Sequence, residues 1–221
     1  MQTRTLEITT AVFLITGAVL ANVAFVGLGS AFDYPQILKQ PTDVIFQKFT
    51  AHQGAISFWF VLLALGAGLI APIAIFLSRL FPGRLSRLMM FAGIAASVVQ
   101  VTGLMRWPLI VPGFIASGNV EMFEFFHDIL GTFVGETLGY FFTGAWTILV
   151  SRNIAPQLAG SWFASLGTLS AGLILSGIFI PGGLPGLEIA NFIGYVLWSV
   201  WMIIFGVLLL RRGSSPVQET N

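Results

Sequence analysis

The sequence contains no cysteine and very few charged residues. None of its 221 residues is Cys and only 9% are Asp, Glu, Lys or Arg, whereas about 25% are charged in an average soluble domain. Without cysteine the chain has no disulfides, thiolate metal sites or cysteine nucleophiles. With so little charge it cannot form a water-soluble exterior, because soluble proteins place charged side chains over much of their surface. Soluble enzyme folds and nucleic-acid binding are therefore excluded.

Apolar and aromatic side chains are abundant instead, and they form long uncharged runs. Hydrophobic residues make up 56% of the chain, with 21 Phe and 6 Trp. A transmembrane helix requires about 20 apolar residues. The sequence predicts six spans, at about residues 8–30, 54–78, 88–106, 127–150, 161–181 and 189–210. The expected fold is an all-α transmembrane bundle that forms a single domain over residues 1–221, with the lipid bilayer as its first partner.

The distribution of basic residues predicts the orientation of this bundle, because cytoplasmic loops retain positive charge. Of the ten Lys and Arg residues, Lys39, Lys48 and Arg106 fall on one side of the predicted spans. The other seven fall on the opposite side: Arg4, Arg79, Arg84, Arg87, Arg152, Arg211 and Arg212. Both termini are therefore predicted to be cytoplasmic in a multi-pass protein of the cell membrane. The longer connections, at about residues 31–52 and 107–126, are predicted to face outward.

Glu136 is the one acidic residue predicted to lie deep inside a span. An ionisable side chain at the centre of a membrane helix costs about 2.5–3.5 kcal/mol, so one that persists usually faces protein or water. With α-helical periodicity, Glu124, Asp128 and Glu136 share one face of the fourth span, and Tyr140 lies at its margin. Glycines repeat along the same face at Gly131, Gly135 and Gly139. Small residues at this spacing favour the close approach of another helix.

Other ionisable residues lie near the outer ends of the predicted spans. Arg106 ends the third span and His127 begins the fourth. Two roles are open for the Arg106 side chain: it pairs with an acid such as Glu124, or it anchors the helix end in the lipid headgroups. The expected site is an outward-facing pocket lined by Arg106, Glu124, His127, Asp128, Glu136 and Tyr140.

The second histidine of the chain suggests an alternative site. The sequence after Pro41 predicts a helix that starts in the outer connection and continues into the second span, with His52 on its apolar, inward face. His52 and His127 could then both ligate a haem iron. They could also hold zinc together with Glu124 or Asp128, with an open position for water. No diagnostic metal-binding spacing, such as two histidines four residues apart with an acid between them, is present.

Several stretches of the chain resemble a known family. The likeness is carried by residues 32–35, 99–107 and 127–139 and by a last span that ends in Arg211-Arg212. They resemble bacterial multi-helix membrane proteins known only as a domain of unknown function. The resemblance implies a helical bundle in a bacterial membrane and implies no activity. It marks Arg106, His127 and Glu136 as motif positions without roles, and His52 lies outside the motif.

Three functions are consistent with these features. The first is a small-ligand or proton-linked carrier or sensor, because chains of ionisable residues in membranes often mark solute or proton paths. The second is a membrane redox protein or enzyme with haem or a metal ion near the outer face. The third is an accessory structural subunit whose polar residues satisfy helix packing. No Gly-x-Ser-x-Gly motif is present, which disfavours a serine nucleophile. Ligand or proton handling is the preferred function.

Overall fold

The computed structural model describes residues 3–212, and over this range the chain forms helices and no strands. Six helical segments are long and apolar enough to cross a membrane, which confirms the predicted number of spans. The first three are built from α1 (Thr3–Phe32), α3 (Gln53–Gly68) with α4 (Ile70–Leu80), and α5 (Ser86–Leu109) with α6 (Val111–Ser117).

The fourth span contains three consecutive helical segments. It is made of α7 (Val120–Phe126), the π-helix η2 (His127–Leu138) and α8 (Gly139–Asn153). The fifth and sixth spans are α10 (Ser161–Ser176) with the 3-10 helix η3 (Gly177–Gly182), and α11 (Leu187–Arg212). Short helices fill the remaining connections: η1 (Gln36–Lys39), α2 (Thr42–Ala51) and α9 (Ala155–Ala159).

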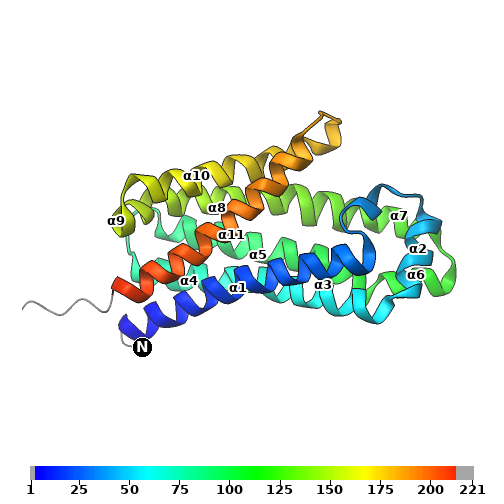
Figure 1. The fold of residues 1–221 in the computed structure, drawn as a ribbon, viewed down its shortest axis with the longest axis horizontal. Coiled ribbons are helices and arrows are strands. Elements are labelled where there is room, and N and C mark those ends of the chain that lie inside the picture. The colour runs from blue at the N-terminus through cyan, green and yellow to red at the C-terminus, as the bar shows by residue number, and fades with distance from the viewer. Residues whose placement is uncertain (1–2, 213–221) are drawn as a thin grey trace, which may run out of the picture.

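The spans run side by side along the long axis of the molecule (Figure 1). The start of α1 and the end of α11 lie at one end of the bundle, which we call the terminal end, and α2, α6 and α7 lie at the other, the loop end. The first and last described helices therefore begin and end at the same end of the bundle, and the cytoplasmic location of both termini stays a prediction. Helix α1 packs on α3, α4 and α11, and α5 packs on α3, α4, α8 and η2.

A proline interrupts the second span and a serine from another helix compensates for it. Pro72 lacks an amide hydrogen, so it leaves the carbonyl group of Gly68, four residues earlier, without its helical donor. The chain accordingly divides into α3 and α4 at Leu69. The hydroxyl of Ser97 on α5 donates a hydrogen bond of 3.1 Å to the Gly68 carbonyl oxygen. The break therefore fixes the position of α5 against the second span.

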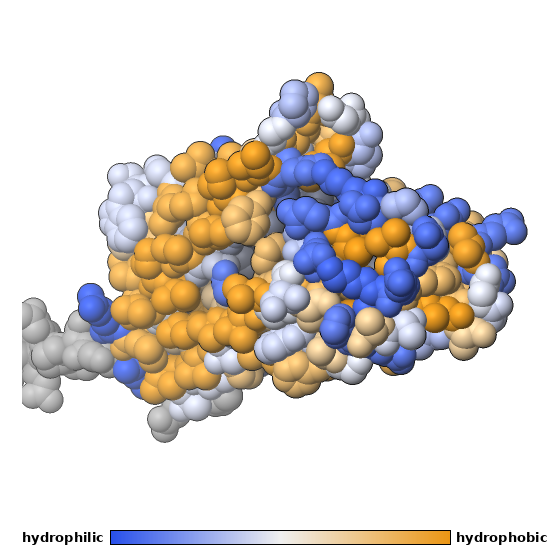
Figure 2. Space-filling model, turned by 45° about the vertical axis from the view of Figure 1, so that its right-hand side comes forward, coloured by the Kyte–Doolittle hydropathy of each residue, from blue (hydrophilic) through white to orange (hydrophobic). Residues whose placement is uncertain are grey.

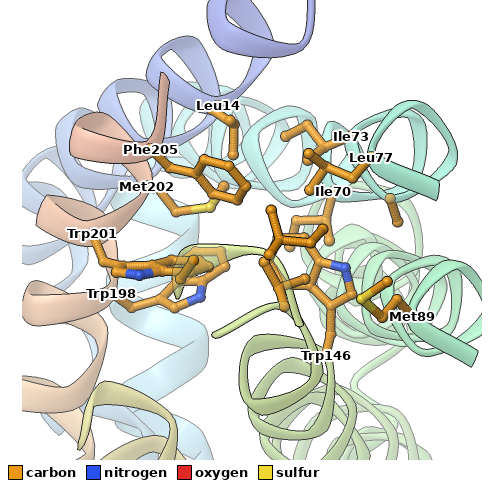
Figure 3. Close-up of a cluster of buried hydrophobic side chains, with 14 of the residues drawn as sticks. Leu14, Ile70, Ile73, Leu77, Met89, Trp146, Trp198, Trp201, Met202 and Phe205 are labelled. Carbon is orange, nitrogen blue, oxygen red and sulfur yellow. The ribbon is translucent and has the colours of Figure 1, made fainter. Parts of the chain in front are cut away.

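Two hydrophobic clusters fill the bundle. The terminal-end cluster contains Trp146, Trp198 and Trp201 among aliphatic residues of α1, α4 and α5 (Figure 3). The loop-end cluster is mostly aromatic, and in it the rings of Phe60 and Trp107 stack with centroids 5.2 Å apart. The outer surface of the spans is also apolar, and Figure 2 shows hydrophobic side chains over the helices with hydrophilic side chains gathered toward the loop end. Such an exterior suits a multi-pass membrane protein.

Candidate functional site

A set of polar side chains lies between the two hydrophobic clusters. Tyr34 packs against the loop-end cluster, whereas Tyr140 and Tyr195 pack against the terminal-end cluster. Glu136 interacts electrostatically with all three tyrosines, so its carboxylate lies between the clusters. We call this set the polar layer: Tyr34, Gln100, Arg106, Glu136, Tyr140, Thr143 and Tyr195.

Arg106 is the most deeply buried charged residue of the layer, with 7% of its surface exposed. Its Nη1 donates a hydrogen bond of 2.6 Å to the carbonyl oxygen of Gly103, and its Cζ lies 5.1 Å from the centroid of the Trp107 ring. Its Nε is buried, and no group among residues 3–212 accepts a hydrogen bond from it. No carboxylate in the same range lies within ion-pair distance. Burying an ion costs several kcal/mol, which one charged hydrogen bond and a ring contact offset only in part.

This burial corrects two expectations for Arg106. The side chain does not anchor the helix end in the headgroups, and it does not form an ion pair with Glu124. Its charge and Pro108 suggested that the third span ends at residue 106, whereas α5 continues to Leu109 and α6 follows. Pro108 lies in the last turn of α5, and the helix ends one residue after it.

Glycines allow α5 and η2 to approach closely around the Arg106 side chain. A Cβ atom at Gly131 would lie 2.6 Å from Nη2 and 2.8 Å from Cζ of Arg106. A Cβ atom at Gly103 would lie 2.5 Å from the Cα of Gly135. No larger residue fits at these positions without displacement of the guanidinium or the backbone. The close approach predicted from the glycine spacing is thus confirmed, and its function here is to make room for an arginine.

The segment that carries Glu136 is a π-helix rather than an α-helix. In η2 the hydrogen bonds skip one more residue than in an α-helix, and the hydroxyl of Thr137 correspondingly donates to the carbonyl oxygen of Thr132, five residues back, at 2.9 Å. The α-helix expected for these residues is therefore wrong. Asp128 is exposed while Glu136 is half-buried, and the shared polar face of Glu124, Asp128 and Glu136 stays a prediction. Long π-helical segments are rare and frequently occur at functional sites.

The carboxylate of Glu136 has no hydrogen bond or ion pair with any residue between 3 and 212. It interacts electrostatically with Arg106 across the layer. The two groups carry opposite formal charges. Neither is saturated by partners, which leaves both able to bind another group.

Tyr34 reaches the layer from the connection between α1 and η1, outside the spans. Its ring packs edge-on against Phe60 with centroids 5.5 Å apart. Burial, with a smaller contribution from the Glu136 carboxylate and an opposing one from Arg106, raises the pKa of the Tyr34 phenol to about 12. Its usual value is about 10. The phenol therefore stays neutral at physiological pH and can donate a hydrogen bond toward the layer.

Hydrogen bonds extend the layer toward the terminal end. The side-chain amide of Gln100 on α5 donates to the hydroxyl of Thr143 on α8 at 2.6 Å. Tyr195 on α11 interacts with the same hydroxyl, and its ring lies 6.0 Å from that of Tyr140. These contacts connect α5, α8 and α11, which belong to the third, fourth and sixth spans.

The other predicted residues lie toward the loop end. His127 is half-buried, its ring lies 5.5 Å from that of Phe123, and its Nδ1 is buried without a partner among the described residues. It interacts electrostatically with Arg106, Asp128 and Glu124. Glu124 is exposed and accepts a hydrogen bond of 2.7 Å from Thr42 of α2. The structure thus brings the predicted pocket residues into one connected set, with Glu124 and Asp128 at the surface and Glu136 inside.

His52 does not join this set. The predicted helix does begin at Thr42, but it breaks at His52, which ends α2, precedes α3 and is exposed. The inward orientation expected for His52 is therefore wrong, and a haem iron held between His52 and His127 does not fit. Over residues 3–212, no three His, Asp or Glu side chains come together as a metal site. The zinc arrangement with Glu124 or Asp128 does not fit either.

Sequence reasoning did not assign four members of the layer to the site: Tyr34, Gln100, Thr143 and Tyr195. Nothing in the spacing of Gln100 and Tyr195 linked them to Glu136. Tyr34 lies in a connection, where periodicity carries no signal. Only the packing of distant segments brings these residues together.

The chain matches, over residues 9–206, the family described as "Domain of unknown function (DUF4386)". The match covers most of the sequence, so the chain belongs to this family, in agreement with the resemblance found from its motifs. Searches among curated proteins and among solved structures find no match to the chain.

Proposed function

We propose that the protein binds a small anionic ligand from the loop end and takes up one proton with each anion. The observation that carries this proposal is the buried Arg106, which lacks an ion pair and has a buried, unpartnered Nε. A guanidinium presents donors in a planar fork that matches a carboxylate or phosphate. A small carboxylate is the simplest ligand of this class.

The proton follows from the proximity of Glu136. The Glu136 carboxylate interacts with Arg106, and a bound anion competes with it for the guanidinium. Two negative charges that share one site disfavour each other, so Glu136 becomes protonated when the ligand anion binds. The balance is one anion and one proton bound, whether the ligand arrives as the anion with a solvent proton or as the neutral acid. No net charge then enters the membrane.

The surrounding residues fit this exchange. Tyr34 and Tyr140 place hydroxyl groups near Glu136, and these groups can pass a proton or hold a ligand oxygen. His127 lies between Arg106 and the exposed acids Glu124 and Asp128, along the route from the loop end. The same exchange serves a carrier or a sensor, because chains of ionisable groups mark proton and solute paths in membranes.

The connection that covers the loop end is fastened by ion pairs. Lys39 lies 2.6 Å from a carboxylate oxygen of Glu188 at the start of α11, and Lys48 pairs with Asp33. Exposed pairs are weak, with typical values of about 0–1 kcal/mol. Opening of the connection formed by η1 and α2 is therefore the expected route by which a ligand reaches Arg106.

The proposal is tested by measuring proton uptake while small carboxylate salts are added. Purified protein in mild detergent and weak buffer is titrated with formate, acetate and benzoate, with a pH dye reporting proton uptake and thermal stability reporting binding. A ligand at 100 times its Kd stabilises the folded state by about 2.7 kcal/mol. The wild-type protein should take up one proton per bound anion. Glu136→Gln should bind the anion without proton uptake, and Arg106→Met should not bind it.

Glu121→Gln is the matched control, since Glu121 is an exposed acid at the loop end. It should behave as the wild-type protein in both assays. Binding that survives Arg106→Met, or proton uptake that survives Glu136→Gln, contradicts the proposal. If anion binding is observed, flux of the same carboxylate into liposomes containing the protein distinguishes a carrier from a sensor.

A further inference from the structure

A separate pocket lies at the terminal end of the bundle, far from the polar layer. It is formed by the turn between α4 and α5, the junction of α8 with α9, and the end of α11. Arg84, Arg212, Ser86 and Gln157 contribute polar groups to its lining, while Met89 and Ile154 are buried and form apolar lining. The pocket therefore has a polar part and an apolar part.

The charged residues that line it are two arginines. Among residues 3–212 no acidic residue lines the pocket, and neither Arg84 nor Arg212 takes part in an ion pair within this range. The guanidinium of Arg212 is positioned over the ring of Phe81, with its Cζ 4.8 Å from the centroid. A ring contact of this kind orients an arginine without neutralising it. Two guanidinium groups thus border one pocket, and no acid in the described part of the chain pairs with them.

The position of the pocket indicates the class of anion that it can bind. Its walls are the ends of four spans, at Leu80, Ser86, Asn153 and Arg212. Span ends lie at the level of the lipid headgroups. The exposed side chain of Leu85 also borders the pocket, where it can contact the glycerol or the first methylenes of a lipid.

We propose that this pocket binds the phosphate group of an anionic membrane lipid, with Arg84 and Arg212 on the phosphate oxygens and the apolar lining against the base of the lipid chains. Arginine is suited to this role because its fork of donors binds phosphate in a bidentate manner. The shared chemistry is the phosphate group, and its place at the span ends favours a lipid over free phosphate. The site does not depend on the proposed function of Arg106.

The test is native mass spectrometry of the full chain from mild detergent, with phosphatidylglycerol, with phosphatidylcholine of the same chains, and with inorganic phosphate. The wild-type protein should retain one phosphatidylglycerol in preference to phosphatidylcholine. The double variant Arg84→Gln/Arg212→Gln should bind phosphatidylglycerol at least about tenfold more weakly, because even one lost charge-assisted contact contributes about that factor.

The matched control is Arg87→Gln/Arg211→Gln, which removes the same charge at positions close in sequence, Arg87 at the start of α5 and Arg211 next to Arg212 at the end of α11. Both residues are exposed and neither lines the pocket. The control should retain the lipid as the wild-type protein does. An equal loss in both double variants, or equal retention of phosphatidylcholine, overturns the proposal, since either would indicate general attraction to the arginine-rich end. Inorganic phosphate bound as tightly as phosphatidylglycerol overturns the assignment to a lipid. Thermal unfolding of each variant verifies that it is folded.

Discussion

Replacing Gly131 with alanine is expected to destabilise the protein, because the new methyl group would occupy the space of the Arg106 guanidinium. The added Cβ would lie 2.6 Å from Nη2, so the guanidinium must move and its hydrogen bond to Gly103 weakens. Overpacking costs about 1–3 kcal/mol and loss of a hydrogen bond from a charged group about 1.5–3 kcal/mol. The higher helix propensity of alanine offsets up to about 1 kcal/mol of this destabilisation. The expected net loss is about 2–4 kcal/mol.

Equilibrium unfolding in mixed micelles with increasing sodium dodecyl sulfate measures this loss. The matched control is Gly172→Ala in α10, where an added Cβ meets nothing within 4 Å, so its stability should stay the same or rise. In the background of Arg106→Met the guanidinium is absent, and Gly131→Ala should then cost about 2 kcal/mol less than in the wild-type chain. If the two substitutions are additive, the packing of Gly131 against Arg106 is refuted.

Three further substitutions test other parts of the bundle. Ser97→Ala removes the donor to the Gly68 carbonyl and should lower the free energy of unfolding by about 1–3 kcal/mol; an unchanged micelle-unfolding midpoint would contradict this. Gly103→Ala places a Cβ 2.5 Å from the Cα of Gly135 and should lower the thermal midpoint, because backbone cannot yield as a side chain does; an unchanged midpoint would refute the contact. Tyr34 has a pKa of about 12 in the folded protein, and the unfolded phenol ionises near 10, so the stabilisation is present below pH 10 and lost as pH rises toward 12. Between pH 10 and 11 the wild-type protein should lose up to about 1 kcal/mol relative to Tyr34→Phe, and parallel pH profiles of the two proteins would argue against a buried phenol.

The spans could be predicted from the sequence because hydropathy is a strong local signal. Membrane helices satisfy their backbone hydrogen bonds internally, so each apolar run determines its own secondary structure. The basic residues expected on one side, such as Arg84 and Arg212, do lie together at the terminal end. Glu136 also stood out, since an acid inside a predicted span is rare in a chain with so few charged residues.

The details of the site could not be predicted because they depend on tertiary packing. Nothing local distinguishes η2 from an α-helix, and its i to i+5 hydrogen bonds form where Gly131 and Gly135 pack against α5. The α-helical hydrogen bonding expected for residues 127–138 is therefore wrong. The break at His52 likewise exposed a residue that helical spacing placed inside. Tyr34 enters the layer only through the path of the connection after α1.

The central claim is that Glu136 gains a proton when an anion binds at Arg106. Infrared difference spectroscopy with and without a bound carboxylate tests it most directly, since a protonated carboxyl group has its own C=O stretching band, and an isotope-labelled ligand separates the ligand's bands from those of the protein. The account predicts that such a band appears on ligand binding in the wild-type protein and in Glu121→Gln, and that it is missing in Glu136→Gln. A band that persists in Glu136→Gln, or ligand binding without any such band in the wild-type protein, would contradict it.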